Sequence, residues 1–385
     1  MILRLLVGAD DRSGALETAG ACADAGLVSV VTTRARAAGV PTEIEVEVVD
    51  LGTRHVSSDE AVARTVALIG PASATGTRDA RYAHKIDSTL RGNWASEVVG
   101  RQRLTGERVL VVAAAPAAGR TCRGGVVHAH GRPVAEGAAG VDARRPIASS
   151  RPADLLTTAG ARVVVELGGE GALAAWLHGD DAPIAVVDAE TDADLDVIAR
   201  GWASCDDGTI LAGTGAAIGA GARALVGPRS SPGRPGVDRP ALVVCGSRHP
   251  VARAQVDGLV QAGARPVRPD DPPTTALAAW QEDGIVVLTP AEQGDADADL
   301  VAHALGASAA RLARAAPGWA TLVLVGGDTA AVVLGDQVVV VGGTLAPGVA
   351  WGHVLGSSAP LVVAKPGGFG DAATLVRLLG GRLTP

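Results

Sequence analysis

Two short segments of this chain gather side chains that could bind an anionic group. The first is K-I-D-S-T-L-R-G-N, from Lys85 to Asn93, and the second is K-P-G-G-F-G, from Lys365 to Gly370. Lys85 and Lys365 are the only lysines in the sequence, which otherwise uses arginine as its cation. A lysine offers a compact charge with three rotatable donors, which suits a phosphate or carboxylate oxygen. The two lysines therefore predict where substrate chemistry takes place, with chance clustering as the alternative.

The first segment is typical of a site for a small polyhydroxylated acid. Lys85 and Arg91 could bind a carboxylate, because both are donors only. Asp87, Ser88 and Asn93 could bind hydroxyl groups. The alternative is a polar loop in which a hydroxyl only caps the following helix.

A pair of adjacent carboxylates, Asp10 and Asp11, ends the first expected strand. Either could accept the proton of an attacking hydroxyl or hold a metal ion. An aspartate before a helix also caps free backbone N–H groups, which is the simpler interpretation for one of the two. The sequence does not distinguish which carboxylate is the base.

Three glycine-containing turns in the second half each follow an expected strand. They are Gly246-Ser247-Arg248, Gly326-Gly327-Asp328-Thr329 and the segment from Lys365 through Gly367, Gly368 and Phe369 to Gly370. Glycine lets backbone N–H groups approach phosphate oxygens, and a helix starting just afterwards adds a favourable field. The three turns together predict a nucleotide site, although no G-x-x-x-x-G-K-[ST] motif is present.

Two further patterns suggest other classes of site. His128 and His130 form an H-x-H pair in an expected hairpin, but no third ligand is near in sequence, so we predict no protein-bound metal. The segment Gly213 to Gly219 resembles a dinucleotide fingerprint with altered spacing. An NAD(P)-dependent oxidoreductase is therefore an alternative function, and tight strand–helix packing is the simpler explanation of these glycines.

Composition narrows the class of protein. The 385 residues carry a formal net charge of -7, and no basic run appears, which argues against a nucleic-acid partner. No apolar run is long enough to span a membrane. The four cysteines lie far apart and form no C-x-x-C pair. We expect a cytoplasmic enzyme whose partners are small molecules. A homodimer is an alternative to a monomer.

Apolar runs alternate with segments of helical period along the whole chain. In the first part, strands are expected at 2–7, 28–33, 46–51, 109–115, 162–167, 184–188 and 209–213, and helices at 14–25, 58–69, 94–102, 172–178 and 195–203. After a Pro- and Gly-rich stretch at 227–240, strands are expected at 241–245, 284–288, 321–325, 338–341 and 361–364, and helices at 251–262, 295–315 and 371–379. The alternation predicts an α/β fold with two domains, 1–228 and 239–385, each a mostly parallel sheet with helices on both faces.

Taken together, these motifs resemble those of the four-carbon acid sugar kinase family. The resemblance rests on A-D-D-R-S-G-A at the start, the Lys85–Asn93 segment, P-A-A-G-R-T ending at Arg120 and Thr121, G-G-D-T-A, P-G-V-A-W-G and the final K-P-G-G-F-G. They cover nearly the whole chain in the family's order. Four positions depart from the family pattern: Ser13, His249, Ala252 and Pro366.

The resemblance implies an ATP-dependent kinase that forms the 4-phosphate of a sugar acid such as D-threonate, D-erythronate or a 3-oxo-tetronate. The first domain would bind the sugar acid, with Arg120 among the binding residues and Lys85 at the catalytic centre. The second domain would bind ATP through Ser247 and the two later turns, with Mg²⁺ bridging the phosphates. Asp10 or Asp11 would be the base. A divergent protein that binds these ligands without catalysis is a further alternative.

Overall fold

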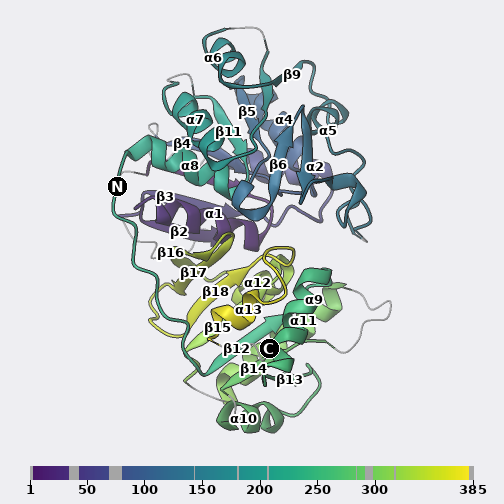
Figure 1. Ribbon diagram of the computed structural model, residues 1–385, viewed down its shortest axis with the longest axis vertical. Coiled ribbons are helices and arrows are strands. Elements are labelled where there is room, and N and C mark those ends of the chain that lie inside the picture. The colour runs from purple at the N-terminus through teal and green to yellow at the C-terminus, as the bar shows by residue number, and fades with distance from the viewer. Residues whose placement is uncertain are drawn as a thin grey trace.

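A computed structural model describes residues 3–33, 43–68, 80–142, 144–179, 182–205, 208–282, 284–290, 298–315 and 318–380. Among these residues, no helix is long and apolar enough to cross a membrane. The chain forms two stacked regions that share one long sheet, and an extended segment along one side connects them (Figure 1).

The first half of the chain contributes eight parallel strands in the order β2-β3-β1-β4-β11-β5-β10-β9. Their bounds are β1 Leu5–Ala9, β2 Ser29–Thr33, β3 Val46–Asp50, β4 Arg81–Lys85, β5 Val109–Val112, β9 Val164–Leu167, β10 Ile184–Val187 and β11 Ile210–Gly213. The helices are α1 Arg12–Asp24, α2 Ser58–Val66, α4 Trp94–Thr105, α5 Pro152–Thr158, α6 Glu170–His178, α7 Asp192–Ala203 and α8 Gly215–Val226. A small antiparallel sheet sits outside this layer, with β6 Arg120–Arg123, β7 Val126–Ala129 and β8 Arg132–Pro133, next to the short turns η1 Pro116–Ala118 and η2 Val134–Glu136.

The second half contributes seven strands in the order β13-β14-β12-β15-β18-β17-β16. The parallel strands are β12 Ala241–Cys245, β13 Arg265–Val267, β14 Ile285–Leu288, β15 Thr321–Val325 and β18 Leu361–Lys365, and the antiparallel pair is β16 Val339–Ala346 and β17 Val349–Val354. The helices are α9 Pro250–Gln261, α10 Pro273–Glu282, α11 Ala298–Ala315, α12 Gly327–Leu334 and α13 Thr374–Leu378.

The two sheets join edge to edge through β16 and β2. These strands pair antiparallel, with Val339 opposite Val31 and Val341 opposite Ser29. The result is one sheet of 15 strands rather than two separate ones. The predicted α/β class with mostly parallel strands is confirmed, whereas the expectation of separate sheets missed this junction.

Helices cover both faces of the long sheet. On one face a single apolar cluster continues through both halves and includes side chains of α1, α7 and α8 together with those of α11 and α12. On the other face there are two clusters, one beneath α4 and α5 and one beneath α9 and α13. Helix α1 lies at the join and packs on β16, β17 and α12 as well as on its own half. Its Gly20 permits this contact, because an added Cβ would lie 3.0 Å from the carbonyl oxygen of Gly343.

Most predicted elements appear with shifted ends. Helix α7 starts earlier than expected because Thr191 and Asp194 form a capping box. Strand β16 runs on to Ala346 and turns into β17, which the sequence analysis did not anticipate, nor did it anticipate β13, α5, α8 and α10. The expected helix at 371–379 is reduced to α13, and the expected strand at 109–115 ends at Val112. Parts of three predictions, at residues 2, 69 and 295–297, lie outside the described residues.

Candidate active site

The carboxyl ends of strands from both halves meet at one cleft. Its volume is about 650 Å³, and its lining includes residues that follow β1, β3 and β4 in the first half and β12, β15 and β18 in the second. Ligand sites of open α/β sheets lie at this edge. Of the predicted site residues, the cleft is lined by Asp11, Lys85, Asp87, Ser88, Arg91, Arg120, Ser247, Gly326, Gly327, Asp328, Thr329, Gly367, Gly368 and Phe369. Asp10, Asn93 and Gly370 are not among the lining residues.

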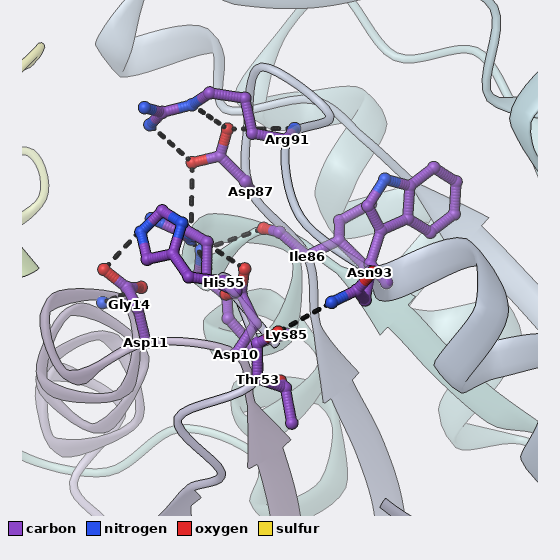
Figure 2. Close-up of polar contacts among 12 residues, drawn as sticks. Asp10, Asp11, Gly14, Thr53, His55, Lys85, Ile86, Asp87, Arg91 and Asn93 are labelled. Atoms are coloured by element: carbon purple, nitrogen blue, oxygen red, sulfur yellow. Dashed lines mark hydrogen bonds and ion pairs between the residues drawn. The ribbon is translucent and has the colours of Figure 1, made fainter. Parts of the chain in front are cut away.

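The two aspartates after β1 have different surroundings. Asp10 is fully buried, and both of its oxygens accept hydrogen bonds from Arg54, at 2.7 and 2.8 Å. Burial raises the pKa of Asp10, and the charge of Arg54 opposes that rise. Asp11 faces the cleft and caps α1 by accepting from the Gly14 N–H at 2.9 Å (Figure 2). Asp11 therefore combines the two roles predicted for this pair: it caps a helix, and its carboxylate lines the cleft.

Arg54 connects three carboxylates of the site. Besides Asp10, its guanidinium lies 3.0 Å from Asp11 and 3.5 Å from Asp87. These charges outweigh burial and raise the pKa of Arg54 well above its usual value. Arg54 thus fixes the relative positions of the acids that follow β1 and β4.

Lys85 ends β4 and is almost completely buried at the base of the cleft. Its ammonium group donates to the Ile86 carbonyl at 2.9 Å and lies 3.5 Å from a carboxylate oxygen of Glu17 on α1. Glu17 and the nearby aspartates overcome burial and raise the pKa of Lys85. Burial raises the pKa of Glu17 in turn. The lysine is therefore a charged donor held at the carboxyl edge of the sheet.

Asp87 and Arg91 form a close pair in the loop between β4 and α4 (Figure 2). Two nitrogens of Arg91 donate to Asp87, at 3.1 and 3.2 Å, and a third lies 3.1 Å from Asp142. The charges of Arg91 and Arg54 outweigh burial and hold the pKa of Asp87 well below its usual range. Asp87 is thus an ionised acceptor.

The other polar residues of this loop divide between the cleft and the fold. Ser88 is buried and lines the cleft. Asn93 turns away and donates to the carbonyls of Thr53 and Val56, at 2.7 and 2.9 Å (Figure 2). The amide of Asn93 therefore holds the loop that carries Arg54.

Arg120 begins β6 and reaches across to the second half. Its guanidinium donates to the Ala118 carbonyl at 2.7 Å and to the Gly368 carbonyl at 3.3 Å. It also lies over the ring of Phe369, 5.5 Å from the ring centre. The side chain thus links the expected substrate-binding half to the last glycine turn.

The three glycine turns of the second half are neighbours, because β12, β15 and β18 are adjacent parallel strands. The Thr329 hydroxyl accepts from the Gly246 N–H at 3.1 Å and so ties the first turn to the second. An added Cβ at Gly367 would lie 2.2 Å from the Ser247 hydroxyl oxygen and 3.1 Å from the Ser247 Cβ, so glycine favours the close approach of the third turn to the first. The turns form one surface, called here the backbone surface, in which closely approaching glycine backbone lies beside the side chains of Ser247, His249, Asp328 and Thr329.

Lys365 has a different environment from that of Lys85. It is fully buried beneath the last turn, where its ammonium group donates to the carbonyls of Pro366 and Phe369 at 2.6 and 2.9 Å. Burial lowers the pKa of Lys365 to about 8. Gln255 supports the same turn by donating to the carbonyls of Phe369 and Asp371. The second rare lysine shapes the turn from below, and it does not line the cleft.

The two halves touch across the cleft at the start of α12. An added Cβ at Gly327 would lie 2.0 Å from a carboxylate oxygen of Asp11. Asp328 lies 3.6 Å from His55 and 3.2 Å from Arg144, both in the first half. Bonding to His55 lowers the pKa of Asp328. The arrangement places the base candidate beside the expected nucleotide turn.

The glycine segment 213–219, which resembles a dinucleotide fingerprint, lies where α8 begins and packs on α1. Thr214 caps α8 by accepting from the Ala217 N–H, and an added Cβ at Gly219 would lie 2.6 Å from that of Ala21 in α1. The glycines of 213–219 therefore serve helix packing, as the simpler explanation predicts.

Among the described residues, no group of three or more His, Cys, Asp or Glu side chains is arranged to hold a metal ion.

Residues 5–221 match the family model for a sugar-binding N-terminal domain, and residues 242–375 match the model for a nucleotide-binding C-terminal domain. The chain belongs to the four-carbon acid sugar kinase family. These kinases are phosphotransferases with an alcohol group as acceptor. The resemblance to this family that the sequence motifs indicated is therefore confirmed.

Similar proteins include two family members named D-threonate kinase. The one from Bordetella bronchiseptica is 32% identical over 96% of this chain and 95% of its own length. The one from Salmonella typhimurium is 32% identical over 68% of this chain and 62% of its own length.

Solved structures of similar fold also cover nearly the whole chain. One, titled a putative tRNA synthase from Salmonella typhimurium LT2, has a TM-score of 0.77 at 23% identity and covers 97% of this chain and 98% of its own. Another, from Bordetella bronchiseptica, is titled a domain of unknown function with bound citrate, a domain-swapped dimer. It has a TM-score of 0.52 at 30% identity over 97% of both chains.

In this kinase-family cleft, five charged residues were missed by sequence reasoning. Each contacts a predicted site residue or lies within ion-pair distance of one: Glu17, Arg54, His55, Asp142 and Arg144. Arg54 and His55 had a usable signal, because they follow the strand at 46–50 just as Asp10 and Asp11 follow the first. Glu17 lies within α1, and Asp142 and Arg144 lie in an irregular segment, so no periodicity marks them.

Proposed function

We propose that this protein transfers the γ-phosphoryl group of ATP to the terminal hydroxyl of a four-carbon sugar acid and forms the 4-phosphate. D-threonate is the first candidate because two similar proteins carry that name. D-erythronate and 3-oxo-tetronate belong to the same chemical class. The observation that carries the proposal is the single cleft lined by the charged loops of the first half and the glycine turns of the second.

The sugar acid is proposed to bind against the loop that follows β4. Lys85 and Arg91 supply positive charge for its carboxylate, since both line the cleft and retain donors beyond those used within the protein. Asp87 and Ser88 face its hydroxyl groups. Asn93 supports this surface from behind through the Thr53 and Val56 carbonyls.

Asp11 is proposed as the general base, with Asp10 as its anchor. A base must reach the hydroxyl proton, and of the two only Asp11 is among the residues that line the cleft. Asp10 instead fixes Arg54, which in turn orients Asp11. In the reaction the hydroxyl oxygen attacks the γ-phosphorus, its proton passes to Asp11, and ADP leaves with the electrons of the broken P–O bond.

ATP is proposed to bind on the backbone surface of the second half, the domain we place at 239–385, opposite a sugar-acid domain at 1–228. The turns at Gly246–Ser247, Gly326–Thr329 and Gly367–Phe369 present N–H groups, and the start of α12 adds the field of a helix N-terminus. Gly370 completes the last turn. Mg²⁺ would arrive with the nucleotide, bridge its phosphates and neutralise their charge.

We also propose that the protein works in the cytoplasm, where ATP is available, and that it forms a homodimer. The similar chain from Bordetella bronchiseptica is titled a domain-swapped dimer. Here, Gly227 to Pro240 is an extended connection without regular structure, long enough to let two copies exchange halves. Light scattering of the purified protein would distinguish a dimer from a monomer.

An ADP-release assay with purified protein across a panel of four- and five-carbon sugar acids tests the activity. We expect release that depends on ATP, on Mg²⁺ and on a four-carbon acid, with mass spectrometry identifying the 4-phosphate. Absence of release with every acid, at a protein concentration where calorimetry detects ATP binding, would refute the proposed reaction.

A further inference from the structure

Arg120 differs from the three basic residues at the end of β4 and in the loops that follow β3 and β4. Arg54, Lys85 and Arg91 each lie within 3.5 Å of a carboxylate. Among the described residues, Arg120 has no carboxylate within ion-pair distance, and its hydrogen bonds go to backbone carbonyls and a histidine ring. It is 5% exposed, and its buried Nε–H has no partner. A buried guanidinium with unused donors and no counter-ion is suited to receive an anion.

The location of Arg120 indicates which anion. The residue belongs to the first half, yet one of its nitrogens donates to the Gly368 carbonyl and its guanidinium lies over the Phe369 ring. The charges of Asp87 and Glu17 act on it from the sugar-acid side. It thus lies between the loop proposed to bind the sugar acid and the last glycine turn proposed to bind ATP.

His130 holds this guanidinium in place. Its Nε2 lies 2.8 Å from a terminal nitrogen of Arg120 and accepts the hydrogen bond, because arginine is a donor only. The acceptor must be an unprotonated ring nitrogen. Burial and the charge of Arg120 both lower the pKa of His130, which favours that form. His130 belongs to the H-x-H pair for which no metal role was expected.

The turn between β7 and β8 brings the side chains of Arg120 and His130 together. His130 and Gly131, with φ +50 and +80, are the two central residues of the turn between β7 and β8, where positive φ is the usual geometry. The His130 N–H donates to the Gly119 carbonyl at 2.8 Å. An added Cβ at Gly119 would lie 2.5 Å from Nδ1 of His130. Glycine before Arg120 therefore leaves room for the ring.

We propose that Arg120 contacts the phosphoryl group during its transfer and that His130 is the positioning residue that aims Arg120 across the cleft. The inference rests on the proposed kinase reaction and assigns Arg120 to the transition state rather than to the sugar-acid carboxylate. As the bond from the γ-phosphorus to the ADP oxygen breaks and the bond to the sugar-acid oxygen forms, the guanidinium neutralises charge on the transferred oxygens.

The two assignments of Arg120 predict opposite kinetics. A residue that acts only in the transition state changes kcat and leaves substrate binding unchanged, whereas a carboxylate-binding residue raises KM for the sugar acid. We expect Arg120→Gln, which removes charged donors aimed at the transition state, to lower kcat about 10²- to 10³-fold. Affinities for ATP–Mg²⁺ and for the sugar acid, measured by calorimetry, should stay within about threefold. A KM for the sugar acid that rises while kcat is unchanged would overturn the assignment.

The histidine pair supplies its own control for the positioning role. His130→Phe keeps a ring but removes the acceptor, and we expect kcat to fall about tenfold with substrate affinities unchanged. His130→Asn, which tolerates the left-handed backbone and keeps an acceptor, should recover part of that loss. His128→Phe, in the same hairpin and outside the cleft lining, should turn over at the wild-type rate. Equal losses in His128→Phe and His130→Phe would mean that only the hairpin fold matters.

A spectroscopic measurement separates this inference from the proposed function. The ¹⁵N signal of the Arg120 Nε–H, assigned with Arg120→Lys, should shift in His130→Phe and stay unchanged in His128→Phe. Wild-type protein that is inactive with every sugar acid would overturn the phosphoryl role together with the proposed function, and the signal would still decide the positioning role. Active wild-type protein with a signal unchanged by His130→Phe would overturn the positioning role alone.

Discussion

The two sides of the cleft are built from different material. On the first-half side, charged side chains are already paired with one another, as in the contacts of Arg54 with Asp10, Asp11 and Asp87. On the second-half side, glycine turns approach one another closely, and the buried Lys365 donates to two carbonyl oxygens of its own turn. One side is thus set by side-chain chemistry and the other by close backbone approach.

We infer from this difference how each side would recognise its proposed ligand. Paired charges hold acceptors and donors in fixed directions, which suits an acid whose hydroxyl groups must be told apart. Backbone N–H groups and a helix N-terminus bind phosphate oxygens without needing any particular side chain. Substitutions should therefore act through charge and shape on the first side and through added volume on the second.

The largest expected effect on the side-chain surface comes from Asp11→Asn. The amide cannot accept a proton, although it fills the same volume and still caps α1. We expect turnover to fall about 10²- to 10⁴-fold with little change in melting temperature. Steady-state kinetics and a melting curve for the purified variant would check this.

Asp10→Asn is the matched comparison, because it removes the neighbouring charge behind the cleft. It breaks the buried pair with Arg54, a change that typically costs about 3–5 kcal/mol of stability. We expect a lower melting temperature and a smaller loss of turnover than in Asp11→Asn. If both variants melt lower but turn over normally, the pair is only a cap and the base lies elsewhere, with Asp87 the next candidate.

On the backbone surface, Gly327→Ala tests whether volume alone disrupts the site. The new Cβ would lie 2.0 Å from the Asp11 carboxylate, so either that side chain must turn out of its position or the two halves must shift apart. Displacements of about 1 Å can cost up to about 10²-fold in rate, and we expect a loss of about tenfold or more in kcat. Gly171→Ala, in a helix with open space around it, should turn over normally. Normal turnover in Gly327→Ala would show that the halves do not need this contact.

The two surfaces also differ in how well the sequence predicts them. On the charged side, residue type and position at the end of a strand or after it singled out Asp11, Lys85, Asp87 and Arg91, and the structure brings all four to the cleft. Arg54 was missed although it follows a strand as the two aspartates do, because its importance comes from three partners that are distant in sequence. The glycine turns could be placed after strands, but their mutual contact depends on strand order.

At the level of the fold, the α/β class and most elements followed from hydrophobic periodicity. The 15-stranded sheet did not, because the pairing of β16 with β2 joins edge strands about three hundred residues apart. The observed ends differ from the expected ones where a cap starts a helix earlier, as in α7, or where pairing with another strand extends a strand, as in β16. Lys365 shows a further limit, since its rarity predicted a ligand contact while its location makes it a support for the turn.

A smaller effect is expected for Lys85→Arg, which keeps the charge and changes only its shape. Lys85 is buried against Gly14 and Glu17, where an added Cβ on Gly14 would already lie 3.4 Å from the ammonium nitrogen. A planar guanidinium cannot replace a compact donor in that space. We expect a loss of at least about tenfold in kcat/KM, or roughly 1.4 kcal/mol. Turnover near the wild-type value in this variant would mean that charge alone suffices.

The smallest effect on turnover is expected for the other lysine, because Lys365 does not line the cleft and supports the last turn from below. Lys365→Met should weaken ATP binding a few-fold, through a looser turn, and leave sugar-acid binding unchanged. Calorimetry with each ligand would check this. A large loss of sugar-acid affinity would contradict the division between the two sides.

The sharper signature of Lys365 is the pH dependence of stability. Burial lowers its pKa to about 8 in the folded protein, below the ordinary 10.5, so the unfolded chain binds this proton more tightly. Stability therefore carries the full cost of the buried ammonium below pH 8, and that cost is relieved as pH rises from 8 towards 10.5. A shift of this size corresponds to at most about 3 kcal/mol, and the two carbonyl acceptors reduce this cost because they favour the charged form.

We expect the free energy of unfolding of the wild type, minus that of Lys365→Met, to increase between pH 8 and 10. Urea titrations of both proteins at the same pH values cancel the titration of the neighbouring Cys245, whose pKa burial also raises. A difference that stays flat across this range would mean that the ammonium remains charged, held by the carbonyls of Pro366 and Phe369.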